Sequence, residues 1–169
     1  MTAVGQVKRA VAAAIKAAGC AAIESYSEEQ LKRYATAVAA VGTKETVIEE
    51  SGAAQYLGEK VDEATQETVS VYGRKMLLTL LIEVHAPRTL GAAGCEKAAE
   101  AVTQALMTAL PEGLKLGSLQ WGKTGWDKMT GMFRLDASAK YAAYFVAEAA
   151  EDETVFTDFV LKGTVKERE

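Results

Sequence analysis

The second half of the chain constrains the fold most, because it carries the pattern of a strand, a helix and three more strands in succession. Residues 76–84 form an apolar run of strand length, and residues 95–110 carry an apolar stripe with helical spacing. Three later stretches, 114–121, 133–145 and 155–165, have the character of strands. This order predicts a sheet with one long helix packed on it, and no catalytic motif is evident along it.

Alternation with a period of two is clearest in residues 133–145. The odd positions are Phe, Leu, Ala or Tyr, whereas the even positions include Arg134, Asp136, Ser138 and Lys140. This pattern predicts a strand with one face toward the core. In the earlier run, alternate apolar residues share one face and predict a central strand, either continuous with residues 69–72 or broken at Gly73. That apolar face comprises Leu78, Leu80, Ile82 and Val84.

Two helices are expected from residues that recur at steps of three and four. The longer helix spans residues 92–109 and ends before Pro111, and its predicted buried stripe contains Cys95, Ala98, Ala99, Val102, Ala105, Leu106 and Ala109. The N-terminal helix spans residues 3–18, with Val4, Val7, Val11, Ile15 and Ala18 on one face. Ser27 and Gln30 match a capping box, which predicts a short helical turn after Ser27.

The region between these elements is less regular. Residues 34–41 favour a first strand that Gly42 ends, and residues 46–48 either extend it or lie in a loop. Residues 51–67 predict a long loop with one helical turn near residues 53–57, and loops of this length are often functional. We therefore expect a single α+β domain over residues 1–169. It should have a mixed or antiparallel sheet, one long helix packed on a face, an N-terminal helix, and a strand-rich part at residues 114–166.

Composition excludes several classes of protein. The chain has 169 residues, of which 49% are hydrophobic and 25% charged, as in a soluble globular domain. No apolar run is long enough to span a membrane, and the N-terminal segment is amphipathic, unlike a secretion signal. A net charge of −4 argues against a protein that grips nucleic acid, although DNA could pass through a pore without binding.

The two cysteines, Cys20 and Cys95, each lie among alanines on an expected helix. They are best interpreted as buried free thiols in a protein that folds in the reducing cytoplasm. A disulfide or a metal site would usually show more Cys or His residues.

One motif carries a chemical meaning that has to be weighed. Residues 117–124 match the phosphate-loop pattern G-x-x-x-x-G-K-[ST], in which Lys123 would contact the outer phosphates and Thr124 a magnesium ion. The context differs from that of such a loop, because residues 119–121 alternate like a strand and glycines, instead of a helical stripe, follow Thr124. A hairpin tip rich in Gly and Lys is the favoured interpretation, and nucleotide binding is a remote alternative.

No other motif indicates catalysis. His85 is the single histidine and has no partner at ligand spacing, so we expect no metal site. The acidic residues at 148–153 fit a solvated turn better than an acid–base pair. Trp121, Trp126 and Met129 lie close in sequence and would suit a partner surface if exposed, or core packing if buried. We predict no catalytic residue, no cofactor and no metal ligand.

Several short motifs in order carry a resemblance to a known family. They lie at residues 31–34, 56–59, 72–75, 94–95, 122–127, 131–134 and 159–163. From about Leu31 the chain resembles small tail proteins encoded in prophages of Gram-positive bacteria. The order of helix, strands, helix and strands is similar to the tail-terminator (tail-completion) fold.

This resemblance implies a structural component of a phage tail or phage-tail-like particle, assembled in the cytoplasm of the bacterial host. In that family, subunits form a hexameric ring, or collar, that caps the tail tube, and in contractile tails they also contact the sheath. Long loops and hairpins make the contacts, so the candidate interface residues are Tyr56, Leu57, Glu59, Lys123, Trp126, Lys128 and Met129. The alternative within the same particle is a tube or connector protein.

Overall fold

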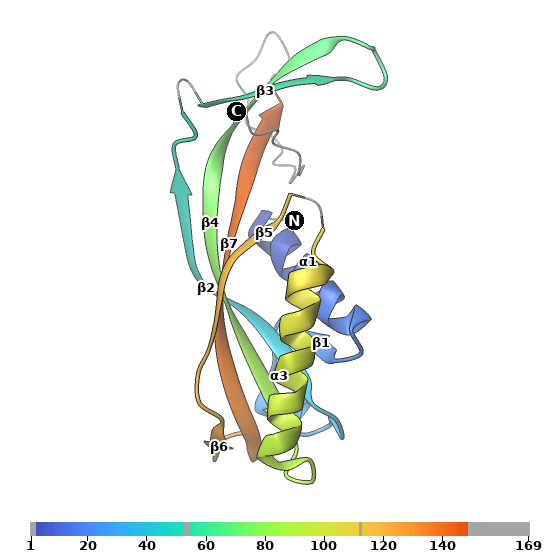
Figure 1. Ribbon diagram of the computed structural model, residues 1–169, viewed down its shortest axis with the longest axis vertical. Helices are drawn as coiled ribbons and strands as arrows, with labels where there is room; N and C mark the ends of the chain where they lie inside the picture. The colour runs from blue at the N-terminus through green and yellow to red at the C-terminus, as the bar shows by residue number, and fades with distance from the viewer. Residues whose placement is uncertain (1–2, 53–54, 112, 149–169) are drawn as a thin grey trace.

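The computed structural model describes residues 3–52, 55–111 and 113–148, and these form one α+β arrangement (Figure 1). The expectation of a mixed sheet with one long helix packed on it and a further N-terminal helix is confirmed. In chain order the elements are α1 (Ala3–Ala17), β1 (Ala21–Ile23), α2 (Glu28–Leu31), β2 (Val38–Glu49), β3 (Tyr56–Val61), β4 (Thr68–Ala86), α3 (Gly91–Thr108), β5 (Lys115–Trp121), β6 (Gly125–Asp127) and β7 (Met132–Glu148).

Two long antiparallel strands, β4 and β7, form the spine of the sheet (Figure 1). They pair from Val71 opposite Glu148 to Ala86 opposite Phe133. The strand order is β1-β2-β4-β7-β5, with β3 paired to β4 and β6 paired to β7. The pairing of β1 with β2 is parallel, and the other pairings are antiparallel, so the sheet is mixed. Gly73 does not break β4, which continues through it.

The core lies between one face of this sheet and the two longer helices. The even positions of β4 and the odd positions of β7 face α1 and α3, as the alternation in the sequence predicts. Buried residues from these four elements include Val7, Val11, Ile15, Leu78, Leu80, Ile82, Val84, Cys95, Val102, Leu106, Leu135, Ala137, Ala139 and Tyr141. Burial of this apolar area is the main stabilising contribution, at about 25 cal/mol per Å² removed from water.

Two details of the helices follow the sequence closely. Leu106 on α3 is 1% exposed whereas its neighbour Met107 is 74% exposed, as expected for a helix with one buried stripe. Ser27 caps α2, because its hydroxyl oxygen accepts a hydrogen bond of 3.3 Å from the backbone N–H of Gln30.

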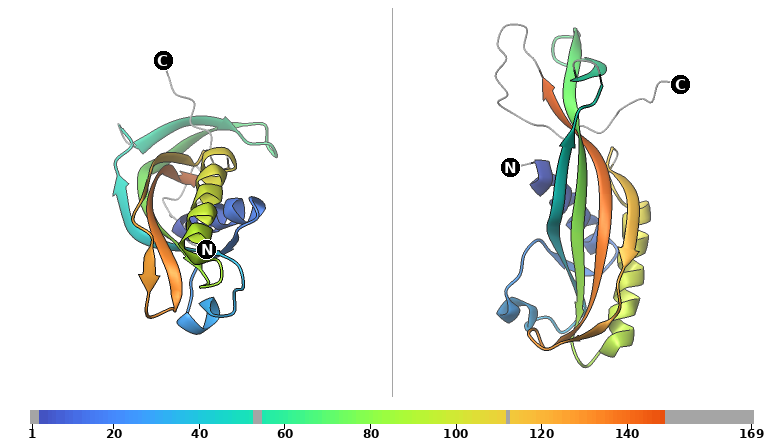
Figure 2. Two further views of the ribbon diagram at one scale, coloured as in Figure 1. Left: turned by 60° about the horizontal axis from the view of Figure 1, so that its bottom comes forward. Right: turned by 90° about the vertical axis from the view of Figure 1, so that its left-hand side faces the viewer.

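A second, smaller cluster lies apart from the main core. Leu31, Val38 and Met132 are buried there, and the partly buried Tyr26 and Tyr34 pack against them. These residues come from the segment around α2, from the start of β2 and from the start of β7. The segment therefore covers the lower end of the sheet, where the chain enters β2 (Figure 2).

The prediction of a long loop at residues 51–67 is wrong. Strand β3 occupies part of this range and forms a hairpin with β4, in which Val61 pairs with Thr68 and Tyr56 with Tyr72. The expected helical turn near residues 53–57 is also wrong for Tyr56 and Leu57, which belong to β3. Gly58, with φ of +137°, lies at a register shift in this pairing. Glycine and the adjacent charged residues have low strand propensity, so the sequence did not indicate this strand. Pairing with β4 stabilises it.

Three further differences concern boundaries. The expectation of a first strand over residues 34–41 that Gly42 ends is wrong at both ends. Strand β2 starts at Val38 and continues through Gly42 to Glu49, so residues 46–48 extend it. The short parallel strand β1 was not anticipated, and Cys20 lies between α1 and β1 instead of on the helix. The strand expected at residues 155–165 and the acidic turn after Glu148 lie outside the described residues.

The sheet extends beyond the helices at one end. There β3 and the first part of β4 project past α1 and α3 (Figures 1 and 2). Large apolar side chains are exposed on β2, β3 and this part of β4, namely Val47, Ile48, Tyr56, Val61 and Tyr72 at 38–57%. Tyr56 and Tyr72 pack edge to face, with ring centroids 5.7 Å apart.

Candidate functional site

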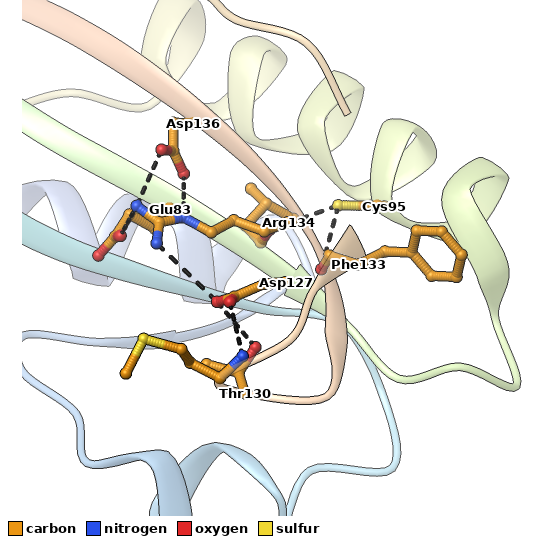
Figure 3. A network of polar contacts seen from close by, with 9 residues as sticks. Glu83, Cys95, Asp127, Thr130, Phe133, Arg134 and Asp136 are labelled. Carbon is orange, nitrogen blue, oxygen red and sulfur yellow. Dashed lines mark hydrogen bonds and ion pairs between the residues drawn. The ribbon is translucent and has the colours of Figure 1, made fainter. Parts of the chain in front are cut away.

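Arg134 of β7 is the centre of a charged network (Figure 3). The network lies on the sheet face opposite the two long helices, because the helices pack on the even positions of β4 and the odd positions of β7. Glu83 and Asp136 are directly opposite each other in the β4–β7 register, where two like charges would repel. The guanidinium of Arg134 forms an ion pair with Glu83 and donates to both carboxylate oxygens of Asp136 at 2.7 and 2.9 Å. Asp127 of β6 lies 3.9 Å from Arg134 Nη1. Arg134 therefore ties three carboxylates of three strands together.

The pKa shifts follow from these contacts. The hydrogen bond to Asp136 raises the pKa of Arg134, although burial opposes this, and Glu83 adds to the increase. Burial opposes ionisation of Asp127, but hydrogen bonds from Met129 and Thr130 and the charge of Arg134 bring its pKa below the usual value. Burial, followed by a hydrogen bond to Glu83, raises the pKa of Tyr26 to about 12. The phenol is therefore neutral at pH 7.

Asp127 also shapes the tight turn between β6 and β7. Its Oδ1 accepts the backbone N–H of Met129 at 3.0 Å, and its Oδ2 accepts the hydroxyl of Thr130 at 3.0 Å (Figure 3). Gly131 closes the turn with φ of +66°, a conformation that glycine adopts without strain. Thr130 is buried, whereas Met129 is 72% exposed at the tip. The turn therefore presents an apolar side chain to solvent on a hydrogen-bonded support.

An open hollow lies beside this turn, lined by Lys123, Trp126, Asp127, Arg134 and Asp136 together with two glycines. Trp126 packs edge to face on Phe133, with centroids 5.1 Å apart, and remains 45% exposed. Two basic and two acidic side chains line the hollow, so it has no strong preference for a ligand of one charge.

The phosphate-loop pattern at residues 117–124 does not form a loop ahead of a helix. Its first five residues lie in β5, which pairs with β7, and the chain continues through Thr124 into β6. The Thr124 hydroxyl donates to Glu96 of α3 at 3.1 Å, and Trp121 Nε1 donates to the Thr103 hydroxyl at 2.9 Å. An extended strand cannot wrap its N–H groups around phosphates, so the geometry gives the nucleotide alternative no support.

His85 is enclosed next to the Arg134 network. It is 0% exposed, its ring lies edge to face with Tyr26 at 5.2 Å, and neither ring nitrogen has a hydrogen-bond partner among the described residues. Burial and the facing Arg134 lower the pKa of His85 from its ordinary value of 6.5, although Asp127 and Asp136 oppose this. Folding therefore disfavours the protonated form of this imidazole.

A pH dependence of stability follows from His85. Because its pKa is lowered on folding, the unfolded chain binds the proton more readily, and stability should fall as the pH drops below 6.5. The loss should amount to at most about 1.4 kcal/mol per pH unit, until the lowered pKa is reached. Urea unfolding between pH 7 and pH 5 measures it. His85→Phe should flatten the profile, and parallel profiles for the variant and the wild type would contradict this account.

The residues predicted as an interface fall into two groups at opposite ends of the molecule (Figure 1). Tyr56, Leu57 and Glu59 lie on β3 at the projecting end, and Tyr56 and Glu59 are exposed. Lys123, Trp126, Lys128 and Met129 lie together between β5 and β7 at the other end, and all four are exposed. The sequence left open whether Trp126 is exposed or packed in the core. Its side chain is partly exposed and also packs on Phe133.

Sequence reasoning missed the Arg134 network and the exposed apolar pair Val47 and Ile48. The alternation in the sequence places Arg134 and Asp136 on the polar face of a strand. The other two partners of Arg134 lie further from it in the sequence: Glu83 lies 51 positions earlier and Asp127 lies 7 positions earlier. The β-branched run at residues 46–48 was the one available signal for an exposed edge strand.

Other classes of site are not evident in the described part of the chain. Within residues 3–52, 55–111 and 113–148, no group of three or more His, Cys, Asp or Glu side chains could hold a metal ion. No helix in these same ranges is long and apolar enough to cross a membrane. Cys20 and Cys95 are buried free thiols, as predicted, and burial first and Glu96 second raise the pKa of Cys95 to about 11.

Comparison with known proteins finds no protein-family model and no curated protein that matches the chain.

Proposed function

We propose that this protein is a structural subunit of a phage tail or phage-tail-like particle, and that it closes the tail tube as a ring-forming terminator. It acts by assembly and carries out no catalysis. Its partners are other copies of itself, in a ring expected to be hexameric, the tube protein and, in a contractile tail, the sheath protein. The resemblance of its short motifs to tail proteins suggests the kind of particle, and the exposed apolar side chains support a role in assembly.

The observation that carries the proposal is that apolar side chains are exposed at both ends of one continuous sheet. One end presents Val61 and Tyr72, and the other presents Trp126 and Met129. Exposed apolar side chains on ordered strands and turns are typical of surfaces that bind proteins. Because the two ends differ, one subunit can contact different neighbours at once, as assembly in a particle requires.

A terminator and a tube protein differ in how contacts repeat. Head-to-tail contacts close into a ring when the rotation between copies closes, and they continue without limit when it does not. A terminator should form one ring and stop, whereas a tube protein should stack. The tube and connector alternatives therefore remain distinguishable by the size of the assembly.

Native mass spectrometry and negative-stain electron microscopy of the purified chain, with and without Mg-ATP, test this proposal. We expect one closed sixfold species without a nucleotide adduct. An open ladder of oligomers or long tubes would favour a tube protein. A stoichiometric ATP adduct that Lys123→Ala abolishes would favour the nucleotide alternative. If the chain is monomeric, gold-labelled antibody on purified particles should mark a single end of the tail, and no label there would reject the proposal.

Met129 offers a direct test of the hairpin tip. Met129→Gln removes an exposed apolar side chain without adding charge, and we expect ring assembly to weaken by roughly tenfold because an apolar contact is lost. The matched control is Met107→Gln on α3, which is 74% exposed and should assemble normally. Sedimentation equilibrium measures both. Equal assembly of the two variants would exclude the hairpin tip from the contact.

A further inference from the structure

The outer edge of β2 is an open strand edge. Strand β1 pairs with β2 at Val38–Ala40 only, and from Val41 to Glu49 no described strand lies on the side away from β4. Residues 43–50 are all exposed. Such an edge presents backbone N–H and C=O groups and is a template for another strand. A register shift between Thr43 and Glu45 interrupts the row, and the regular part of the edge is residues 45–49. Proline, which would block pairing, is missing from residues 41–50, and Val47 and Ile48 are 40% and 43% exposed.

The opposite edge of the same sheet is formed by β5. It pairs with β7 on one side, and no described strand lies on its other side. It offers seven residues against the nine of the open part of β2, so the two edges have comparable lengths. Among the described residues, the sheet therefore has an open edge on each of its two sides, as a head-to-tail contact between copies requires.

The two edges carry opposite charge. The open part of β2 and the residue after it contain Glu45, Glu49 and Glu50, and the one lysine there, Lys44, donates to Ser138 of its own chain at 3.4 Å. On the other side, residues 113–126 contain no carboxylate, and Lys123 lies two residues after the end of β5 at Trp121. The exposed Lys140 of β7 lies opposite Ser118 of β5 on the same sheet face.

We propose that the acidic β2 edge of one copy pairs with the basic β5 edge of the next copy, so that the sheet continues from subunit to subunit. The occupant of each edge is a second copy of this chain. Backbone hydrogen bonds between the edges provide the affinity, and the charges select the heterologous β2–β5 pairing over β2–β2 or β5–β5 pairing. This inference rests on the proposed assembly role and specifies the contact that would build the ring.

The glutamates have a second physical interpretation. Charges on an open edge can act as negative design that keeps strands apart. The two interpretations predict opposite changes in self-association when the glutamates are neutralised. If Glu45 and Glu49 attract lysines of the next copy, Glu45→Gln/Glu49→Gln should weaken self-association. If they keep the edge unpaired, the same variant should self-associate more strongly, and the proposal is then overturned.

Reversing the charges of the two edges in separate variants tests the contact more sharply than neutralising one edge. One variant carries Glu45→Lys/Glu49→Lys, and the other carries Lys123→Glu/Lys140→Glu. Each variant alone sets like charges against each other at the contact, so we expect self-association roughly tenfold weaker than for the wild type. In a one-to-one mixture the new basic β2 edge meets the new acidic β5 edge, and association should return to within about threefold of the wild type.

Sedimentation equilibrium and native mass spectrometry measure this association, and circular dichroism confirms that the exposed substitutions leave the fold intact. Loss in each variant with recovery in the mixture supports the β2–β5 contact, and native mass spectra should then show mixed species in equal proportion. Loss without recovery, or no loss, overturns it. A wild type that stays monomeric up to about 1 mM also overturns it.

These results are separable from the proposed function. Rings that form with unaltered affinity in both charge variants would reject the β2–β5 contact and leave the terminator role standing. Antibody labelling that finds the chain away from the tail end would reject the terminator role even if the two edges pair.

Discussion

Leu106→Ala is expected to lower the free energy of unfolding by about 3 kcal/mol, because it opens a cavity where α3 packs on the sheet. Leu106 is 1% exposed and lies in the core cluster with Val102 on the same helix and Leu135 on β7. Urea unfolding followed by circular dichroism measures the loss. The slope of unfolding free energy against urea concentration should stay constant, since the whole domain still unfolds in one transition.

The control lies one residue further along α3. Met107 is 74% exposed, and Met107→Ala should change stability by less than about 0.5 kcal/mol. A similar loss in the two variants would mean that α3 does not pack on the sheet through the Leu106 side. This comparison tests the central feature of the fold without reference to function.

Arg134→Ala is expected to cost about 2–3 kcal/mol at pH 7. The side chain of Glu83 is only 11% exposed and lies opposite Asp136, so loss of Arg134 leaves two facing carboxylates without their shared cation. The value is below that of a fully buried pair, because the Arg134 side chain is 34% exposed and partly screened by solvent. Equilibrium unfolding in urea measures it.

Two further variants test the cause. Glu83→Gln in the Arg134→Ala background should recover part of the loss, because it removes one of the facing charges. Arg9→Ala breaks an exposed pair with Glu24, whose side chains are 62% and 41% exposed, and should cost less than about 0.5 kcal/mol. Equal losses for Arg134→Ala and Arg9→Ala would show that the network contributes no more than a surface ion pair.

Much of the fold is readable from local patterns. The alternation along β7 and the apolar face of β4 predicted both central strands, because a period of two assigns side chains to faces without knowledge of the partner strand. The stripe on α3 and the cap at Ser27 are equally local, since each depends on residues within a few positions. The candidate interface residues named from the sequence lie at two ends of the molecule, on β3 and around the turn between β6 and β7, and their role in contacts stays a prediction.

Strand β3 and the Arg134 network were not readable in this way. Gly58, Glu59 and Lys60 have no strand propensity of their own, and they are extended because β4 offers a pairing edge. Glu83 and Arg134 are ordinary polar residues in the sequence, and they meet only because the β4–β7 register brings them to one face.

The sequence by itself determined which segments are helices and central strands, and which side of each is buried, because these properties depend on spacing along the chain. Only the tertiary structure decided the register of β4 against β7, the enclosure of His85 beside Tyr26, and which edges of the described sheet have no neighbouring strand. These depend on contacts between residues far apart in the chain. Periodicity places a side chain on a face, but it does not specify which distant residue will lie beside it.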